Sequence, residues 1–228
     1  MLVNDWMNSP VITVEAEDSM QHAVDLMTNH KIGILPVMDK GKLVGIVTDR
    51  DLKQAAPSSV AVFEIKQILY HMARVKMKGI MTRNPITLRP DHTLEEAAEV
   101  LLANNISGCP VLDHENQVLG IITKNDIFKA LISVTAISKK GILFGFLIED
   151  RPGSIKEVTD VIRNFHARLV SILTTYEKSP PGFRHLYVRA FSINRDKLPL
   201  LKKNLEEKAK ILYMVDLKEG TRETYAGY

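Results

Sequence analysis

The chain is short of the residues that mark several protein classes. Among its 228 residues there is one cysteine, Cys109, which excludes an internal disulfide and a cysteine-rich zinc site. No uninterrupted apolar run approaches the roughly 18 residues that a membrane-spanning helix needs. The start, Met1–Trp6, has no basic segment followed by an apolar core. We therefore expect no secretory signal, no membrane span and a cytoplasmic protein.

An excess of one charge is also lacking. Lys and Arg number 30 against 27 Asp and Glu, a net charge of +3, which disfavours a dedicated nucleic-acid binder. The composition, 45% hydrophobic and 25% charged, is typical of a globular protein and excludes a disordered chain. The seven histidines show no spacing suited to zinc, and neither a Gly-x-Ser-x-Gly elbow nor a Walker loop occurs. We expect neither an enzyme nor a metal site.

The first half of the chain contains an internal repeat. Met7–Val14 resembles Met81–Leu88 at an offset of 74 residues, and Gly45–Asp51 matches Gly120–Asp126 at an offset of 75. Each unit of about 50 residues predicts a short strand, an amphipathic helix, a hairpin and a second helix. The short strands are expected at 13–14 and 87–88, and the hairpin strands at 34–38, 43–47, 108–112 and 118–122. A further helix over 60–74 joins the units, and Thr93 with Glu96 predicts a capping box.

Each hairpin leads into its second helix through a Gly-x-x-Thr-x-x-Asp motif. In the first copy, Gly45 permits close approach of another backbone, and Thr48 presents a hydroxyl where free amide groups favour a phosphate. Asp51 follows one helical turn later with two carboxylate oxygens that suit the hydroxyls of a ribose. Thr123 and Asp126 repeat the arrangement. Thr-x-x-Asp is also a capping box, which stabilises a helix without any ligand, so both interpretations stay open.

This repeated order, with the motif at each hairpin exit, resembles a pair of CBS domains over about residues 1–132. We place one domain with its connecting helix at 1–74 and the other at 75–132. The resemblance implies a regulatory module that binds an adenosine-containing ligand: AMP, ADP, ATP or S-adenosylmethionine. Arg50 and Lys124 would add positive charge for the phosphates. The predicted binding residues are Thr13, Ile34, Pro36, Val37, Thr48, Asp49, Arg50 and Asp51 in the first repeat, and Thr87, Gly108, Pro110, Val111, Thr123, Lys124 and Asp126 in the second.

After a linker at 133–140 the pattern changes. Strands are predicted at 142–148, 169–176, 185–193 and 212–217, with helices over 154–165 and 196–209, the βαββαβ order of a split-βαβ, ferredoxin-like fold. Ser154 and Glu157 predict a capping box, and Pro199 falls in the first turn of the second helix. Residues 219–228 are interpreted as a C-terminal tail.

The loop Asp150-Arg151-Pro152-Gly153 lies between the first of these strands and its helix. In this order it resembles the ligand loop of an ACT domain, over about residues 141–218. The resemblance implies a regulatory amino acid bound at the loop, where Gly153 admits the ligand and the helix N-terminus receives its carboxylate. Because Leu169 stands where many such domains have asparagine, a second interpretation stays open: Pro152-Gly153 only turns the chain and the module dimerises.

A CBS pair followed by an ACT domain resembles the acetoin-utilisation (AcuB-type) proteins. The whole pattern predicts a mixed α/β (α+β) regulatory sensor without catalytic activity. Apolar helix faces and open sheet edges predict at least a homodimer. The alternative is a constitutive protein-interaction scaffold with vestigial ligand sites, whose target protein the sequence does not identify. A DNA-bound regulator is a weaker third alternative.

Overall fold

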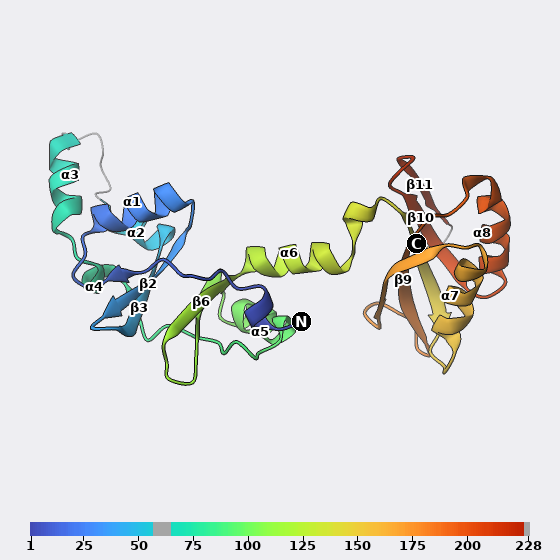
Figure 1. Cartoon of the computed structure of the whole chain (residues 1–228), viewed down its shortest axis with the longest axis horizontal. Coiled ribbons are helices and arrows are strands. Elements are labelled where there is room, and N and C mark those ends of the chain that lie inside the picture. Colours follow the sequence, from blue (N-terminus) through green and yellow to red (C-terminus); the bar gives the residue numbers. More distant parts are fainter. Residues whose placement is uncertain (57–64, 226–228) are drawn as a thin grey trace. The chain divides into compact units, whose positions relative to one another are not determined.

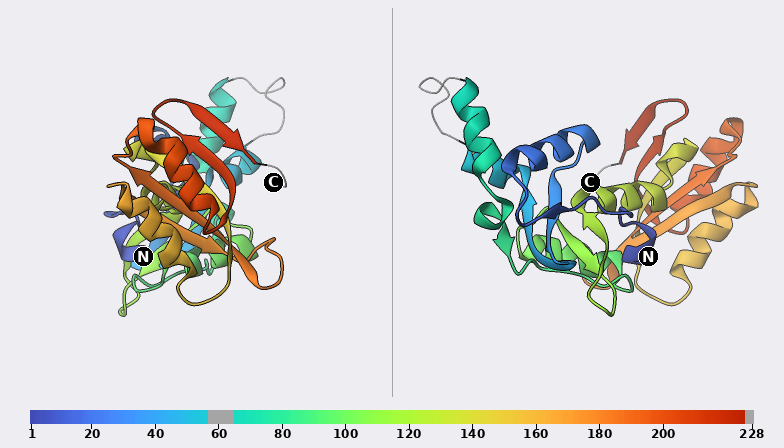
Figure 2. Two further views of the ribbon diagram at one scale, coloured as in Figure 1. Left: turned by 90° about the vertical axis from the view of Figure 1, so that its right-hand side faces the viewer. Right: turned by 60° about the vertical axis from the view of Figure 1, so that its left-hand side comes forward.

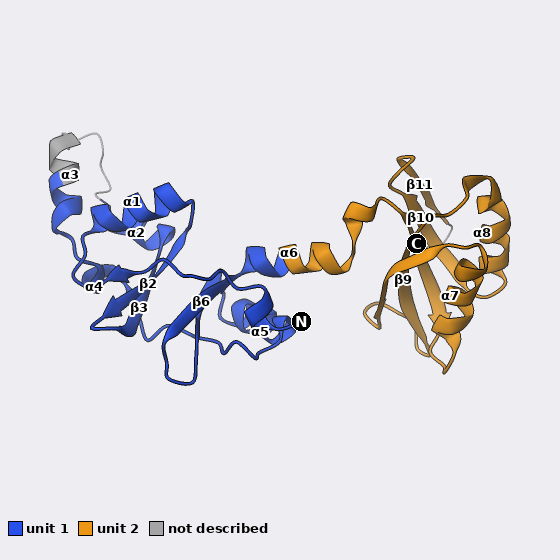
Figure 3. Ribbon diagram, in the orientation of Figure 1, with its two compact units in different colours: residues 1–128 blue, residues 129–228 orange. Residues whose placement is uncertain are grey.

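The computed structural model describes residues 1–56 and 65–225, with the side chains of 65–69 left undescribed. The chain divides into two compact units, Met1–Phe128 and Lys129–Tyr228 (Figure 3). The boundary falls within one helix, slightly before the linker predicted at 133–140. No described helix is long and apolar enough to cross a membrane.

The first unit contains the two predicted repeats (Figure 1). The first repeat consists of β1 (Val14–Glu15), α1 (Met20–His30), β2 (Ile34–Asp39), β3 (Lys42–Thr48) and α2 (Asp49–Ala55). The connection contains α3 (Ile65–Arg74), α4 (Met77–Ile80) and β4 (Thr82–Arg83). The second repeat consists of α5 (Leu94–Ala103), β5 (Gly108–Leu112), β6 (Val118–Thr123) and α6 (Lys124–Val134), and a 3₁₀ turn, η1 (Val3–Asp5), lies near the N-terminus.

Local sequence accounts for where the repeat helices begin and what they bury. Ser19 caps α1 by accepting the His22 amide, and the predicted capping box of Thr93 and Glu96 is present at α5. The apolar positions of α1 point into a core that also contains Leu35, Val37 and Val47 from the hairpin. Burying such side chains contributes about 1.5–3 kcal/mol each, so the helix is held mainly by its apolar face.

The two repeats are interlocked by symmetric pairings. Ser19, at the start of α1, forms a bridge with Lys76, and Thr93, at the start of α5, forms the equivalent bridge with Leu2. The two bridges are equivalent because Thr93 follows Ser19, and Lys76 follows Leu2, by the same 74 residues. A second pair of pairings has the same symmetry. In the first hairpin β3 pairs with β4, and in the second hairpin Ile121 of β6 pairs with Asn8. Each repeat therefore completes the sheet of the other, which joins them into one unit.

Two features of the connecting segments refine the sequence prediction. Residues 57–64, part of the helix expected over 60–74, lie outside the described residues, and the described part from Ile65 is helical. The strand expected at 87–88 is reduced to one parallel bridge between Leu88 and Val111. The reason is that Pro90, two residues later, has no N–H to extend the ladder.

The second unit is a five-stranded sheet with helices on one face (Figures 1 and 2). It contains η2 (Ile137–Lys139), β7 (Ile142–Glu149), α7 (Ser154–Asn164), β8 (Arg168–Thr175), β9 (Phe183–Phe191), η3 (Arg195–Lys197), α8 (Leu198–Glu206), β10 (Lys210–Asp216) and β11 (Thr221–Thr224). The strand order β11-β10-β7-β9-β8 places β7 at the centre between β10 and β9, with all neighbours antiparallel. Alternate residues of β7 and β9 pack against α7 and α8.

Three expectations for this unit need adjustment. The capping box of Ser154 and Glu157 is wrong: Gly153, with φ of +89°, is the N-cap, and the Glu157 carboxylate accepts two hydrogen bonds from Arg151 instead. The predicted tail contains β11, which pairs with β10 across a turn at Gly220. The second helix begins as η3 and continues as α8 with Pro199 in its first turn, as predicted.

Candidate functional site

The first Gly-x-x-Thr-x-x-Asp motif forms a closed hydrogen-bond ring at the start of α2. Asp51 Oδ2 accepts the backbone N–H and the hydroxyl of Thr48, both at 2.7 Å, and the Asp51 N–H donates to Thr48 Oγ1 at 3.3 Å. This is the capping box that the sequence allowed. Only one carboxylate oxygen takes part, and no described group donates to Asp51 Oδ1. Because Asp51 is half-buried, that oxygen is available to a further donor.

The second motif has the same ring with one addition. Asp126 Oδ2 accepts the Thr123 N–H at 3.0 Å, the Thr123 hydroxyl at 2.6 Å and the side-chain amide of Asn8 at 2.8 Å. Asp126 is only 2% exposed. This carboxylate is therefore held inside the protein, whereas that of Asp51 is not.

Asn8 is a site residue that the sequence reasoning missed. It lies at the start of the first repeat, before β1, and reaches the second motif because its backbone exchanges two hydrogen bonds with Ile121, at 2.9 and 3.1 Å. The repeat itself contains a signal, since the counterpart of Asn8 at the 74-residue offset is Thr82, which has no amide to donate. The two motifs are chemically unequal for this reason.

The apolar members of the predicted binding set lie on β2 and β5 beside the motifs, and we name them the slot: Ile34, Pro36, Val37, Gly108, Pro110 and Val111. Ile34 pairs with Thr48 across the first hairpin, and Gly108 pairs with Thr123 across the second. The two positions also meet each other, because a Cβ added at Gly108 would lie 3.0 Å from Ile34 Cδ1. Predicted residues of both repeats thus come together at the starts of β2 and β5.

Other predicted residues are placed less directly. Pro36, Val37, Pro110 and Val111 are buried within β2 and β5, and Thr13 and Thr87 lie just before the chain pairs with these strands. Lys124 is half-buried, and Arg50 is exposed.

Asp49 contacts Lys53 at the surface of α2. The Lys53 ammonium donates to the Asp49 carboxylate at 2.9 Å and lowers the pKa of that carboxyl. In the structure Asp49 therefore has a partner of its own.

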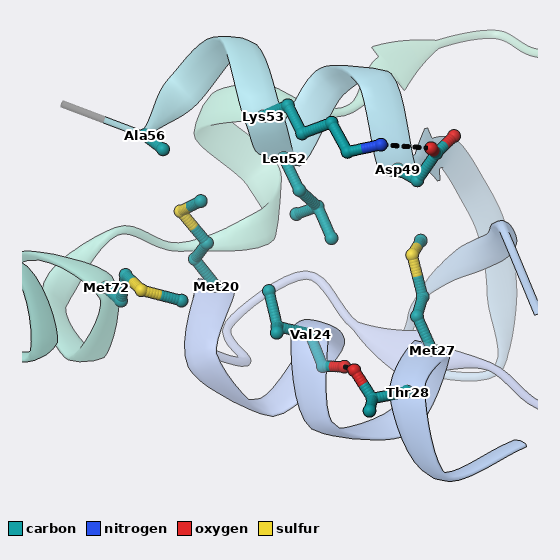
Figure 4. A pocket seen from close by; sticks show the side chains of 9 residues that line it. All are labelled: Met20, Val24, Met27, Thr28, Asp49, Leu52, Lys53, Ala56 and Met72. Atoms are coloured by element: carbon teal, nitrogen blue, oxygen red, sulfur yellow. Dashed lines mark hydrogen bonds and ion pairs between the residues drawn. The ribbon is translucent and has the colours of Figure 1, made fainter. Parts of the chain in front are cut away.

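A cavity of about 290 Å³ lies between α1 and α2 (Figure 4). Its lining is mostly apolar and consists of Met20, Val24, Met27, Thr28, Asp49, Leu52, Lys53, Ala56 and Met72. Only Asp49 belongs to the predicted binding set. The cavity is consequently separate from the slot near Ile34 and Gly108, and its methionines give it an adaptable surface.

Cys109 is buried in β5 next to the slot. Burial raises the pKa of its thiol to about 12. The thiol is therefore protonated at neutral pH and unsuited to nucleophilic attack.

The loop predicted as a ligand site in the second unit borders a cavity of about 680 Å³. The Arg151 side chain lines this cavity and donates to Glu149 at 2.8 Å and to both carboxylate oxygens of Glu157 at 2.8 Å. The hydrogen bonds from Arg151 lower the pKa of the Glu157 carboxyl. Asp150 lies 3.6 Å from Arg184, and Pro152 and Gly153 are exposed. Two glutamates thus already hold the guanidinium that a ligand carboxylate would approach.

Comparisons with known proteins identify the repeats. The CBS domain family matches residues 3–58 and 77–133. A CBS domain-containing protein of Dictyostelium discoideum is 32% identical over 135 residues, which cover 59% of this chain and 93% of that protein.

Solved structures match the same share of the chain. CBSX2 from Arabidopsis thaliana is 28% identical with a TM-score of 0.52, covering 59% of this chain and 96% of that one. CBSX2 has also been solved in complex with AMP (27% identity, TM-score 0.49, 59% and 98% covered). A protein assigned to acetoin utilization (AcuB) from Vibrio cholerae is 25% identical with a TM-score of 0.51, covering 61% and 96%. The tandem pair predicted from the repeat is confirmed, and the chain belongs to the CBS domain family.

Proposed function

We propose that this chain is a non-catalytic regulatory sensor that binds an adenine nucleotide in its CBS pair, with the first motif as the principal site. The observation that carries the proposal is the half-exposed Asp51 carboxylate, whose Oδ1 has no donor among the described residues. By contrast, the matching carboxylate of Asp126 is buried and accepts a hydrogen bond from the side-chain amide of Asn8.

The chemistry of the first motif suits a nucleotide in three respects. The Asp51 oxygen accepts a ribose hydroxyl, and a hydrogen bond to a charged group contributes about 1.5–3 kcal/mol. Arg50, exposed in the first turn of α2, supplies positive charge for a phosphate. The apolar surface near Ile34 and Gly108 supports a flat base.

Calorimetry of the full chain against AMP, ADP, ATP and S-adenosylmethionine tests this proposal. Nucleotide carried over from expression is first removed and its absence checked by absorbance. We expect saturable heat with at least one ligand, and an increase in stability of about 2.7 kcal/mol at 100 times Kd. No heat with any of the four would contradict the proposal.

A second ligand at the ACT-like unit is part of the proposal. The βαββαβ order and the sheet order of the second unit support an ACT-type module, and the cavity beside Arg151 has room for an amino acid. The ligand's carboxylate would replace Glu157 as the hydrogen-bond partner of Arg151. Titration with the twenty amino acids, repeated with Arg151→Gln, distinguishes this from a loop that only turns the chain.

Apolar helix surface on α6 supports the proposed homodimer. Phe128, Leu131 and Ile132 occupy positions i, i+3 and i+4 of α6 and are 59%, 53% and 57% exposed. Three large apolar side chains in a row on one helix face are typical of an interface. We propose that a second copy of the chain covers them.

The scaffold alternative is favoured by a specific observation as well. Both motifs form complete capping boxes that need no ligand. If the protein captures the same partner with and without nucleotide, and no nucleotide binds, the scaffold interpretation replaces the sensor.

A further inference from the structure

The face of the five-stranded sheet opposite α7 and α8 holds a buried arginine on the inner strand β9. Val188 and Ala190 point into the core between the sheet and its helices, so Arg189 points to the opposite face. Nonetheless it is only 5% exposed. A guanidinium rarely occupies such a position without an acidic partner, because burial of an unpaired charge is costly.

Arg189 has few partners for a buried cation. Its Nε donates to the backbone carbonyl of Thr135 at 2.7 Å, and Nη1 is buried with no acceptor among the described residues. No ion pair joins it to a carboxylate in the described part of the chain. Burial lowers its pKa, which reflects the same lack of compensating charge. The Nη1 N–H groups of the Arg189 guanidinium are therefore available to donate hydrogen bonds to a ligand.

A cavity of about 200 Å³ adjoins this guanidinium. Its walls are apolar surfaces of Leu143, Leu173, Tyr187 and Tyr213, and the Ser171 side chain adds a hydroxyl. The rings of Tyr187 and Tyr213 stack with centroids 6.3 Å apart. An apolar chamber with one cationic end is the general form of a site for a small amphiphilic anion.

We propose that this cavity binds a small monocarboxylate with an apolar tail, held by Arg189 through its carboxylate and by the two tyrosine rings and two leucines through its tail. A planar guanidinium matches a carboxylate in bidentate fashion. A single positive charge balances a single negative one, whereas a phosphate dianion would remain undercompensated in an apolar chamber. The site lies on the face opposite α7 and α8, and involves neither the CBS motifs nor Arg151, so it is independent of the function proposed above.

The test uses benzoate as the probe and benzamide as its neutral, near-isosteric control. Titrations of the ¹⁵N-labelled full chain are followed by NMR at the backbone amides of the cavity residues and at the Arg189 side chain. We expect benzoate to saturate with a Kd of about 1 mM or tighter, and benzamide to bind at least tenfold more weakly. Equal binding of the two probes, or no binding of benzoate, would overturn the proposal.

Variants separate recognition from structure. Arg189→Lys keeps a charge but not the fork, and we expect at least a tenfold loss of benzoate affinity. Leu173→Trp fills the cavity from a partly exposed position without altering Arg189, and it should abolish binding even if Arg189 variants fold poorly. Arg222→Met removes an exposed arginine of β11 and should leave affinity unchanged. Benzoate binding that survives Leu173→Trp, or that is lost in Arg222→Met, would place the anion elsewhere and refute the site.

Discussion

Asp51 and Asp126 occupy matching motif positions but differ in what surrounds them. Asp126 accepts hydrogen bonds from Thr123 and Asn8 in a buried position, and Asp51 accepts from Thr48 alone among the described residues, in a half-exposed one. A buried carboxylate with all donors in place acts in stability, because its removal leaves those donors unsatisfied. A half-exposed carboxylate has the capacity to act in binding.

Substitution of the two aspartates should therefore have different effects. We expect Asp51→Ala to weaken nucleotide binding by about 1–3 kcal/mol, the scale of a hydrogen bond to a charged group. Asp126→Ala should lower the free energy of unfolding by about 2–3 kcal/mol, because Asn8 and Thr123 lose their acceptor. Calorimetry and urea unfolding measure the two quantities.

Glu96→Ala provides the matched control, since it removes the capping box of α5, away from either motif. It should lower the free energy of unfolding measurably and leave nucleotide affinity unchanged. If Asp51→Ala behaves in the same way, the first motif is only a helix cap.

Asp216 gives the second unit a pH-dependent contribution to stability. Burial raises the pKa of this carboxyl, but hydrogen bonds from Arg195 and from the backbone of Lys218 and Glu219 lower it further than burial raises it. The pKa of Asp216 is therefore lower in the folded protein than in the unfolded chain, where it lies near 4. The stabilisation is fully present at pH values above the unfolded pKa and is lost as the pH falls through the folded pKa.

Asp216→Asn should accordingly destabilise the protein by about 1.5–3 kcal/mol at pH 7, and the difference from the native sequence should shrink below about pH 4. Urea unfolding at several pH values measures it. Asp160→Asn is the control, because Asp160 pairs with Lys156 at the surface and should change the free energy of unfolding much less than Asp216→Asn does. A difference at Asp216 that persists unchanged at pH 2 would contradict the assignment.

At the scale of elements, close backbone approach holds the interlocked repeats together. A Cβ at Gly120 would lie 2.8 Å from the Asn8 carbonyl oxygen and 2.8 Å from Met7 Sδ. At Gly45 the tightest contact is instead the flexible Met81 side chain, at 2.5 Å, with the Thr82 carbonyl at 3.0 Å. The second hairpin therefore tolerates a side chain less well than the first.

We expect Gly120→Ala to cost about 1–3 kcal/mol by pushing the N-terminal segment off β6. Faster hydrogen exchange at the Asn8 and Ile121 amides would locate the effect. Gly79→Ala is the matched control, because no atom lies within 4 Å of its Cβ and alanine favours the helix α4. Unchanged exchange in Gly120→Ala would mean that the pairing does not depend on this contact.

The elements themselves were predictable to the extent that they are local. Periodicity and repetition located the hairpin strands and the α5 capping box, since neighbouring residues determine both. The exchange of pairing between repeats, and the contact of Asn8 with Asp126, depend on segments 118 residues apart. Likewise, the capping box predicted for Ser154 and Glu157 is wrong because the Glu157 carboxylate binds Arg151 instead. The Ser-x-x-Glu pattern does not reveal this competing hydrogen bond.

For the whole molecule, a closed dimer would give the sensor its means of regulation. Edge strands β8 and β11 and the exposed face of α6 are surfaces that a second copy would cover. A nucleotide changes such an assembly only if it binds two arrangements of the dimer with different affinity. The α6 helix, which runs from the second motif to the start of the other unit, is the element through which a change of arrangement would pass.

We expect light scattering at micromolar concentration to give twice the mass of the chain, with and without nucleotide. Leu131→Glu should shift the protein to a monomer, because an interface would have to bury an unpaired charge. Leu200→Glu is the control, since Leu200 on α8 is 55% exposed but lies outside the proposed interface. A native chain that is monomeric in both conditions would remove the dimer and the coupling that depends on it. Dissociation by Leu200→Glu alone would move the interface from α6 to α8.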